Sequence, residues 1–266
     1  MKNISDILPD KETNFYLITI AYDGSDFAGW ATQPNKLTVQ GCIETILSRV
    51  FKKKINILAA SRTDKGVHAR EQKFTLRINL DFSPKKLFNL LKKVLSKYVL
   101  VKKVQKVDNN FHPIRNVFSK EYRYFINTSK RNIWQKKYRW EYNLPIITKK
   151  LNDILQIFQG RHNFFNYSYC RWPERNQVKN EREITALKCW KKQTIVIISI
   201  KAKNFLRYQI RAIIGEAINC YEGKQKITDL QKKLTNRDKK NYKYRNLAPG
   251  GGLYLWKIDM DILRVK

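Results

Sequence analysis

One stretch of the sequence combines a carboxylate, a guanidinium and a glycine in a pattern that could carry out chemistry. Ser61-Arg62-Thr63-Asp64-Lys65-Gly66-Val67-His68-Ala69 follows a short, mostly apolar run over residues 55–60. An ordinary Asp has a pKa near ~3.9, and the nearby Arg62 would lower the pKa of Asp64 further. Gly66 permits a tight backbone and the close approach of a ligand. The ionised Asp64 is therefore a candidate nucleophile or base, and an ion pair with Arg62 that holds a turn is an equally good interpretation.

Two other positions far along the chain could take part in the same chemistry. Tyr122 and Tyr124 are two residues apart in Lys120-Glu121-Tyr122-Arg123-Tyr124, so a strand would place both on one face. They could stack on a nucleobase or pack in the core. Arg207 and Arg211 are four apart in an expected helix and would share a face. Arg211 could bind a phosphate or pair with a catalytic carboxylate, although a solvated helix face is the commoner role for such a residue.

The composition indicates a folded protein with a polyanionic partner. The 266 residues include 54 Lys and Arg against 22 Asp and Glu, which gives a formal net charge of +32. Because 42% of the residues are hydrophobic, the chain can bury a core, and the charge does not indicate disorder. The cations are interleaved with 14 Tyr, 13 Phe and 6 Trp, on which bases can stack. A nucleic acid is the favoured partner, and a merely solvated basic surface is the alternative.

Several classes of protein fit the sequence poorly. Residues 1–11 are polar and mixed in charge, and lack the apolar centre of a signal peptide. No apolar run approaches the ~20 residues that a membrane-spanning helix needs. The cysteines are far apart and form no CxxC pair, and the chain has only three His; the cysteines are Cys42, Cys170, Cys189 and Cys220. We expect a reduced, cytoplasmic protein that uses no metal and contacts no membrane.

The first half of the chain has the pattern of a ferredoxin-like unit. Apolar alternation and helix-capping residues predict strands and helices in the order β-α-β-β-α-β. The expected strands cover residues 15–22, 55–60, 73–80 and 98–107, and the expected helices begin after Thr38 and Ser83.

The second half repeats this coarse pattern. Strands are predicted over 122–126, 184–190, 194–200 and 253–258, and helices over 147–158 and 205–221, with a tight turn at 191–192. We therefore predict an α+β fold of two ferredoxin-like, RRM-like units whose antiparallel sheets join around a central basic cleft. The expected divisions are an N-terminal tail at 1–12, an N-terminal unit with the catalytic loop at 13–108, and a C-terminal unit at 109–266.

The motifs in their order resemble the tRNA pseudouridine synthase A family from about residue 15 to about residue 260. Arg62-Thr63-Asp64-Lys65-Gly66-Val67-His68-Ala69 resembles the catalytic motif of that family, RTDxGVHA, which is highly specific. Tyr22-Asp23-Gly24, with Phe27-Ala28-Gly29-Trp30 and Gln33, resembles its opening motif. Further matches in the family's order are Phe111-His112, the segment 120–124, Gly160-Arg161-His162-Asn163-Phe164, Phe205-Leu206 with Arg211, and Gly252-Leu253-Tyr254-Leu255.

The resemblance implies a function and roles for individual residues. Asp64 would be the catalytic aspartate, Tyr122 would pack on the target uridine, and Arg211 would pair with the aspartate and help to open the RNA stem. Arg62 is expected among the substrate-binding residues. The resemblance implies isomerisation of uridine to pseudouridine in the anticodon stem-loop of tRNA, at positions 38 to 40, without a cofactor. It also implies a homodimer in which one tRNA contacts both subunits.

The sequence departs from the family pattern at four places. Ser61 stands where Gly is usual and Lys65 where Ala is common, Ala31-Thr32 separates Trp30 from Gln33, and 207–209 replaces a His-containing stretch. None of these removes Asp64, Tyr122 or Arg211, but they bear on the choice of target nucleotide. Two alternatives stay open: a related synthase for other tRNA or RNA uridines, and a non-catalytic RNA-binding protein of the same fold.

Overall fold

The computed structural model describes residues 13–169, 180–235 and 246–262, so the predicted tail at 1–12 lies outside the described residues. The fold is mixed α/β, with one ten-stranded sheet and five α-helices in this part of the chain. The strands are β1 (Asn14–Tyr22), β2 (Leu58–Ala59), β3 (His68–Ile78), β4 (Leu100–Val107), β5 (Val117–Asn127), β6 (Trp140–Glu141), β7 (Gly160–Asn163), β8 (Glu181–Lys192), β9 (Ile195–Ala202) and β10 (Leu253–Met260). The helices are α1 (Val39–Val50), α2 (Pro84–Val94), α3 (Thr148–Gln156), α4 (Gln209–Tyr221) and α5 (Ile227–Thr235), with short 3-10 turns η2 (Ile133–Gln135), η3 (Phe165–Tyr167) and η5 (Gly250–Gly252).

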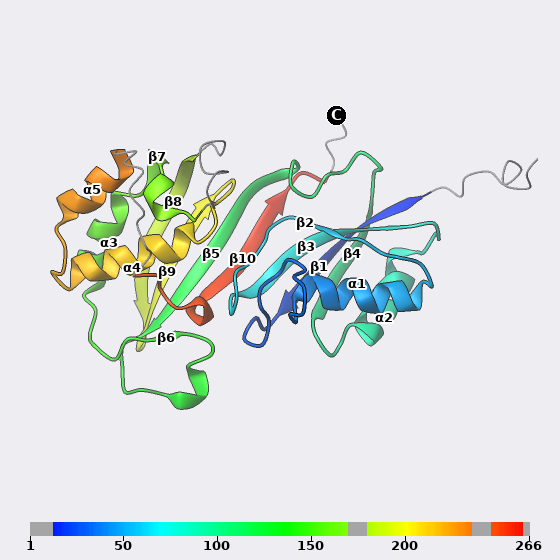
Figure 1. The fold of residues 1–266 in the computed structure, drawn as a ribbon, viewed down its shortest axis with the longest axis horizontal. Helices are drawn as coiled ribbons and strands as arrows, with labels where there is room; N and C mark the ends of the chain where they lie inside the picture. The colour runs from blue at the N-terminus through cyan, green and yellow to red at the C-terminus, as the bar shows by residue number, and fades with distance from the viewer. Residues whose placement is uncertain (1–12, 170–179, 236–245, 263–266) are drawn as a thin grey trace, which may run out of the picture.

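The sheet joins two antiparallel halves through one parallel pair. The strand order is β4-β1-β3-β10-β5-β9-β8-β7, with β2 paired to β3 and β6 paired to β5. Strands β3 and β10 meet in parallel, with Tyr254 opposite His68 and Leu255 opposite Ala69. Strand β10 therefore lies between the two halves of the sheet (Figure 1). It pairs with the last two residues of the Asp64 motif, His68 and Ala69.

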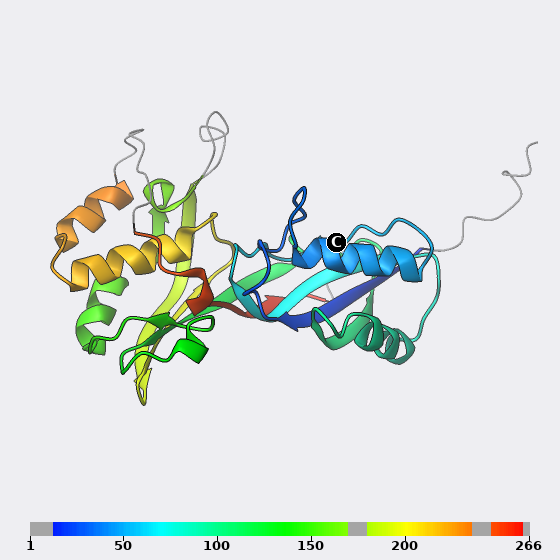
Figure 2. The ribbon, with the colours of Figure 1, turned by 60° about the horizontal axis from the view of Figure 1, so that its bottom comes forward.

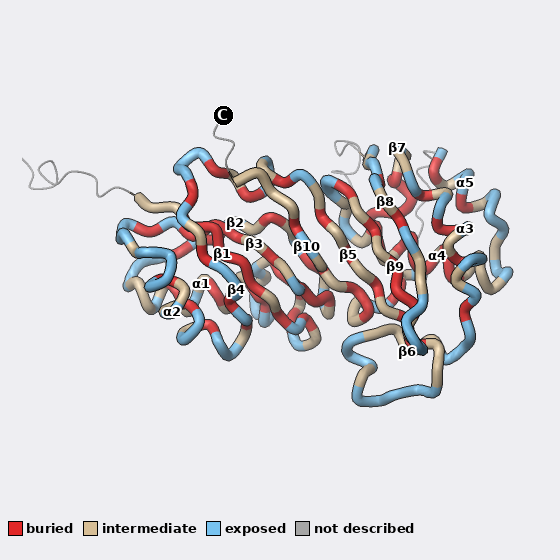
Figure 3. Tube along the Cα trace, turned by 180° about the vertical axis from the view of Figure 1, so that it is seen from behind, coloured by how far each residue is buried: buried red, intermediate tan, exposed pale blue. Residues whose placement is uncertain are grey.

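The helices form two groups over the two halves of the sheet. Figures 1 and 2 show α1 and α2 beside β1, β3 and β4, and α3, α4 and α5 beside β7, β8 and β9. In the view from behind, the strands lie in front of the helices, and exposed and buried residues alternate along them (Figure 3). On β5, Tyr122 and Tyr124 are buried while Glu121 and Arg123 are partly exposed, so the two faces of the sheet differ in chemistry.

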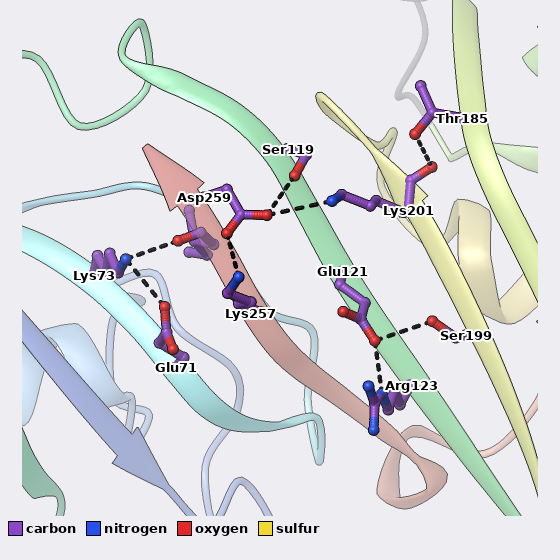
Figure 4. A network of polar contacts seen from close by, with 11 residues as sticks. Glu71, Lys73, Ser119, Glu121, Arg123, Thr185, Ser199, Lys201, Lys257 and Asp259 are labelled. Carbon is purple, nitrogen blue, oxygen red and sulfur yellow. Dashed lines mark hydrogen bonds and ion pairs between the residues drawn. The ribbon is translucent and has the colours of Figure 1, made fainter. Parts of the chain in front are cut away.

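The strand face that carries Glu121 and Arg123 holds a network of polar contacts across the junction. Asp259 of β10 binds Ser119 of β5 at 2.9 Å and Lys257 at 2.7 Å. Lys73 of β3 donates to the carbonyl of Ile258 on β10 at 2.7 Å. Figure 4 shows these contacts running over β3, β10, β5 and β9, so side chains as well as backbone hold the two halves together.

Helix α1 forms where its capping residue and apolar spacing predicted it. The Thr38 side chain accepts a hydrogen bond from the Gly41 N–H, which satisfies a donor that the first turn leaves free. Val39, Ile43 and Leu47 recur on one face and are fully buried. The Ser83-Pro84 cap of α2 is likewise confirmed, because the Ser83 side chain accepts from the Lys86 N–H.

Several predicted boundaries were wrong. Strand β3 begins at His68 instead of 73, and β5 begins at Val117 instead of 122. The strand expected over 55–60 is only Leu58–Ala59. The hairpin turn lies at Gln193-Thr194 instead of 191–192, because Lys192 still pairs with Ile195 and Gln193 takes a φ of 53°. Helix α4 begins at Gln209 rather than at 205, because Tyr208 has a left-handed φ of 62° that interrupts the helical backbone. Arg207 therefore precedes the helix instead of sharing its face with Arg211.

The backbone of the opening motif packs directly against the Asp64 motif. The Trp30 N–H donates to the Thr63 carbonyl at 3.0 Å, and the Gly24 N–H donates to Nδ1 of His68 at 3.1 Å. A Cβ on Gly24 would lie 2.0 Å from the Val67 carbonyl oxygen, so only glycine permits this approach. The glycine of the opening motif is thus explained by the contact that it allows.

We expect Gly24→Ala to destabilise the protein by about 1–3 kcal/mol, because the added methyl group collides with backbone that cannot rotate away. Thermal unfolding measures this, with Asp26→Ala as the control because Asp26 lies in the same loop and its side chain is exposed. Equal melting temperatures for the Gly24→Ala variant and the wild type would contradict the close packing.

Candidate active site

Asp64 lies in the loop between β2 and β3, at the boundary between the two halves of the sheet. The Val67 N–H donates to the Asp64 carbonyl at 3.1 Å, and Gly66 takes a left-handed φ of 77°. This tight turn is the backbone geometry that the sequence predicted from Gly66. It leaves the Asp64 side chain 22% exposed, so the carboxylate is largely removed from water and still accessible.

The cation that faces Asp64 is Arg211. Nη1 of Arg211 lies 4.0 Å from Oδ2 of Asp64, at the outer limit of an ion pair. Arg62 is exposed, and among the described residues the ion pair of Asp64 is with Arg211 and not with Arg62. The turn held by an Arg62–Asp64 pair, which was the alternative interpretation of the motif, is therefore absent.

Burial dominates the electrostatics of Asp64. Desolvation raises the pKa of this carboxyl above its ordinary value, and the positive charges of Arg211 and Arg207 offset only part of the increase. The expectation that a neighbouring cation would lower this pKa was wrong, because the sequence does not show how far the carboxylate is withdrawn from water. The two arginines that do act on it lie nearly 150 residues further along the chain.

Arg211 is held in place by the segment before η5. Its Nε donates to the Ala248 carbonyl at 2.7 Å, and its own carbonyl accepts from the Ala248 N–H at 3.1 Å. Its guanidinium carbon lies 5.4 Å from the centre of the Tyr208 ring. These contacts orient the guanidinium toward Asp64 and leave its Nη atoms for other partners. Nothing in the sequence indicates the contact between Arg211 and Ala248.

Tyr122 lies on β5 with its hydroxyl next to the Asp64 motif. Its Oη shares a hydrogen bond of 2.9 Å with Oγ of Ser61, and its ring meets the edge of Phe205 at 5.3 Å. Burial, together with the negative charge of Asp64, raises the pKa of Tyr122 to about 12, so it is a neutral phenol at pH 7. Ser61, one of the departures from the family pattern, is thus in direct contact with Tyr122.

Lys120 is a residue of this site that the sequence analysis did not single out. Its ammonium group is buried and donates to the Ala60 carbonyl at 2.6 Å, at the start of the catalytic loop. Burial lowers the pKa of Lys120 to about 8. Strand alternation places Lys120 on the same face as Tyr122 and Tyr124, so this pattern could have identified it.

Asp64, Tyr122 and Arg211 therefore come together from a loop, a strand and a helix that are remote in sequence. The arrangement offers one partly buried carboxylate, a guanidinium beside it, and an aromatic ring whose hydroxyl is hydrogen-bonded to Ser61. The Asp64 carboxylate of such a site can attack a carbon atom of a bound, uncharged substrate or remove a proton from it. Among the described residues, no three His, Cys, Asp or Glu side chains gather where they could bind a metal ion. In the same part of the chain, no helix is long and apolar enough to span a membrane.

Comparison with known proteins gives a consistent result. The family model described as tRNA pseudouridine synthase matches residues 18–114 and 154–261. A tRNA pseudouridine synthase A of Mesoplasma florum is 38% identical over 253 residues, which cover 91% of this chain and 97% of the relative. The enzyme of the same name from Dictyoglomus thermophilum is 35% identical over 245 residues, covering 91% of this chain and 98% of the relative.

A solved structure titled "Crystal Structure of a Cbf5-Nop10-Gar1 Complex" shares 10% identity at a TM-score of 0.29, with 74% of this chain and 52% of that chain covered. Similarity at that level carries no weight for the fold. The matches in sequence are decisive, because the family model extends over parts of both halves of the sheet and includes the loop of Asp64 and helix α4, and the relatives cover 91% of this chain. The chain belongs to the tRNA pseudouridine synthase family and is an isomerase of the pseudouridine synthase type.

Proposed function

We propose that this enzyme converts uridine to pseudouridine in the anticodon stem-loop of tRNA, at positions 38 to 40, with Asp64 as the catalytic residue. The observation that carries the proposal is the position of the Asp64 carboxylate. It is largely buried, and Oδ2 lies 4.0 Å from Nη1 of Arg211. Tyr122, whose hydroxyl is hydrogen-bonded to Ser61, lies in the same site. The names of the relatives support tRNA as the substrate, and the anticodon stem-loop rests on the family resemblance.

The reaction breaks the C–N glycosidic bond of one uridine and forms a C–C bond between the same ribose and base. Asp64 begins it in its ionised form, either by attack on C1′ of the ribose or by removal of a ribose proton. The target base must first leave its stack, which costs a few kcal/mol. Partial burial of Asp64 keeps bulk water away from the reacting atoms, which limits hydrolysis of the intermediate.

The neighbouring residues have distinct proposed roles. Tyr122 stacks on the extruded base and recovers about 1–3 kcal/mol of the unstacking cost. Its bond to Ser61 holds the ring at a fixed position for this contact. Arg211 keeps Asp64 ionised and helps to open the RNA stem. Arg62, exposed beside the catalytic turn, contacts the phosphates of the substrate.

The partly buried carboxylate of Asp64 favours a catalytic function over RNA binding alone. A carboxylate in a cleft that faces phosphates repels them, so a protein that only binds RNA gains nothing from Asp64. The remaining positive charge would bind the folded tRNA through its phosphates with little reading of sequence. A related synthase for other uridines remains the second candidate, because Ser61 and residues 207–209 depart from the family pattern.

We further propose two ferredoxin-like units at 13–108 and 109–266, joined around a basic cleft, in a cytoplasmic homodimer. The strand orders β4-β1-β3-β2 and β10-β5-β9-β8 support the repeated unit. Counted along the chain within each half, and leaving out β6 and β7, both orders run fourth, first, third, second. The dimer rests on the family resemblance.

Asp64→Asn should reduce pseudouridine formation to background while the affinity for tRNA stays within about threefold, because phosphate contacts provide most of the affinity. Tritium release from tRNA labelled at C5 of uridine measures the reaction, and mapping of the product positions identifies the target uridines. Asp81→Ala, which removes an exposed carboxylate elsewhere, is the control and should keep full activity. Activity in the Asp64→Asn variant would refute the catalytic assignment.

Arg211→Gln should move the acidic limb of the kcat profile to higher pH. The ionised carboxylate is the active form, so activity is lost as the pH falls through the pKa of Asp64; without Arg211 that pKa rises further. Arg207→Gln should shift the limb in the same direction by a smaller amount, because Arg207 has the weaker effect on Asp64. A limb that stays in place or moves to lower pH in Arg211→Gln would contradict this electrostatic role.

Sedimentation of the free protein should give twice the mass of one chain. A single-chain mass at micromolar concentration would rule out a stable homodimer and leave the catalytic proposal unaffected.

A further inference from the structure

Residues 130–139, here called the basic loop, combine positive charge with exposed apolar side chains. The loop has five cations and no acidic residue, in the sequence Lys130-Arg131-Asn132-Ile133-Trp134-Gln135-Lys136-Lys137-Tyr138-Arg139. The Trp134 side chain is 83% exposed, more than any other large hydrophobic side chain among the described residues, and Ile133 is 65% exposed. Two adjacent apolar side chains exposed among cations make this loop a candidate interaction surface.

Hydrogen bonds within and beside the loop hold it in a defined shape. The Asn132 side chain accepts from the Trp134 N–H at 3.1 Å and so caps η2. The Asn132 N–H donates to the Glu141 carboxylate at 3.1 Å, and the Tyr138 N–H donates to the Gln135 carbonyl at 2.9 Å. These hydrogen bonds fix the backbone on both sides of Trp134, and in that backbone conformation its side chain lies in solvent.

The basic loop is attached to the catalytic and opening motifs. Nε2 of His68 lies 2.9 Å from the Lys137 carbonyl, and the Tyr254 hydroxyl donates to the Tyr138 carbonyl at 2.9 Å. The Tyr138 hydroxyl in turn donates to the Asp23 carboxylate at 2.8 Å. A second acid of the opening segment, Asp26, also contacts the loop, because its Oδ1 lies 3.6 Å from Nζ of Lys137.

The glycines of η5 bring the loop close to Asp64. A Cβ on Gly250 would lie 2.5 Å from the Lys65 carbonyl oxygen, and a Cβ on Gly251 would lie 2.5 Å from the Lys137 carbonyl oxygen. The 3-10 turn therefore fits between the catalytic turn and the basic loop. Figures 1 and 3 show the loop extending beyond β6, away from the sheet, with its residues mostly exposed.

We propose that the basic loop is a second RNA-contact site, in which Trp134 stacks on an unpaired nucleotide of the substrate and Lys130, Arg131 and Lys136 bind the flanking phosphates. The inference rests on the proposed function, because it requires an RNA that already places one nucleotide at Asp64. An exposed aromatic ring surrounded by cations matches the two parts of an unpaired nucleotide, a flat base and an anionic backbone.

The distribution of charge in the basic loop favours RNA as the partner of the exposed Ile133 and Trp134 side chains. Asp23 and Asp26 contact Tyr138 and Lys137 at the inner end of the loop, whereas no ion pair within 4.0 Å is found for Lys130, Arg131 or Lys136 among the described residues. These three charges flank Trp134 in sequence and stay available for phosphates. An anionic membrane is the competing occupant, since it too would accept a tryptophan among cations.

The experiment compares tRNA binding and turnover of Trp134→Ala, Trp134→Phe and the wild type. Trp134→Ala should weaken tRNA binding by about tenfold, through loss of one base stack, and raise KM with kcat nearly unchanged. Trp134→Phe keeps a ring and should recover most of the affinity. Phe118→Ala, which removes another exposed aromatic ring, is the matched control and should bind tRNA normally.

A second set of variants tests the cations. Replacing Arg131 and Lys136 together by Ala should reduce the slope of log affinity against log salt by about 1.5, since each lost phosphate contact accounts for about 0.7–0.9. The matched control replaces Lys92 and Lys93, two exposed lysines of α2, and should leave the slope unchanged.

The outcomes separate this inference from the proposed function. If the wild type forms pseudouridine and Trp134→Ala binds tRNA as tightly as the wild type, the second contact site is wrong and the enzyme assignment stands. If Trp134→Ala instead loses only its sedimentation with phosphatidylglycerol vesicles, the occupant is a membrane and the inference is overturned. If the wild type neither binds tRNA nor forms pseudouridine, the proposed function fails, and this inference fails with it.

Discussion

The geometry of the candidate active site depends on the short parallel pairing between β3 and β10. Only two residue pairs form it, His68 with Tyr254 and Ala69 with Leu255, yet it joins the two antiparallel halves into one sheet. It begins directly after the loop of Asp64, so it fixes that loop against the half that supplies Tyr122 and Arg211. Stacking of His68 on Tyr254 at 4.5 Å and the polar contacts of Asp259 and Lys73 strengthen the same junction.

Glycines allow the segments around this junction to approach one another. Gly24 lies against the Val67 carbonyl, Gly250 against Lys65 and Gly251 against Lys137. The opening motif, the catalytic turn, η5 and the basic loop are consequently stacked with backbone in contact with backbone. A methyl group at any of these three positions would collide with neighbouring main chain. Glycine is needed there because it has no side chain.

The electrostatics of the site result from two opposing effects. Withdrawal from water raises the pKa of Asp64, and Arg211 and Arg207 act in the opposite direction. A carboxylate held in this balance is less well solvated than a surface Asp and keeps a nearby positive charge, which suits a nucleophile or base. Lys120 and Ser61 do not contact the Asp64 carboxylate. Lys120 donates a hydrogen bond to the Ala60 carbonyl, and Ser61 shares one with the Tyr122 hydroxyl.

The sequence by itself determined many of the local elements, the tight turn at Gly66 and the family, because caps, apolar spacing and a specific motif are encoded by neighbouring residues. Helix α1 after Thr38 and the turn at Gly66 are examples. The start of α4 was missed, since a left-handed Tyr208 is not visible in a helical apolar pattern. The tertiary structure alone decided which cation faces Asp64, that Lys120 is buried, and that the basic loop lies beside the catalytic turn. These are properties of segments far apart in the chain, and burial and charge pairing depend on distances in space that spacing in the sequence does not specify.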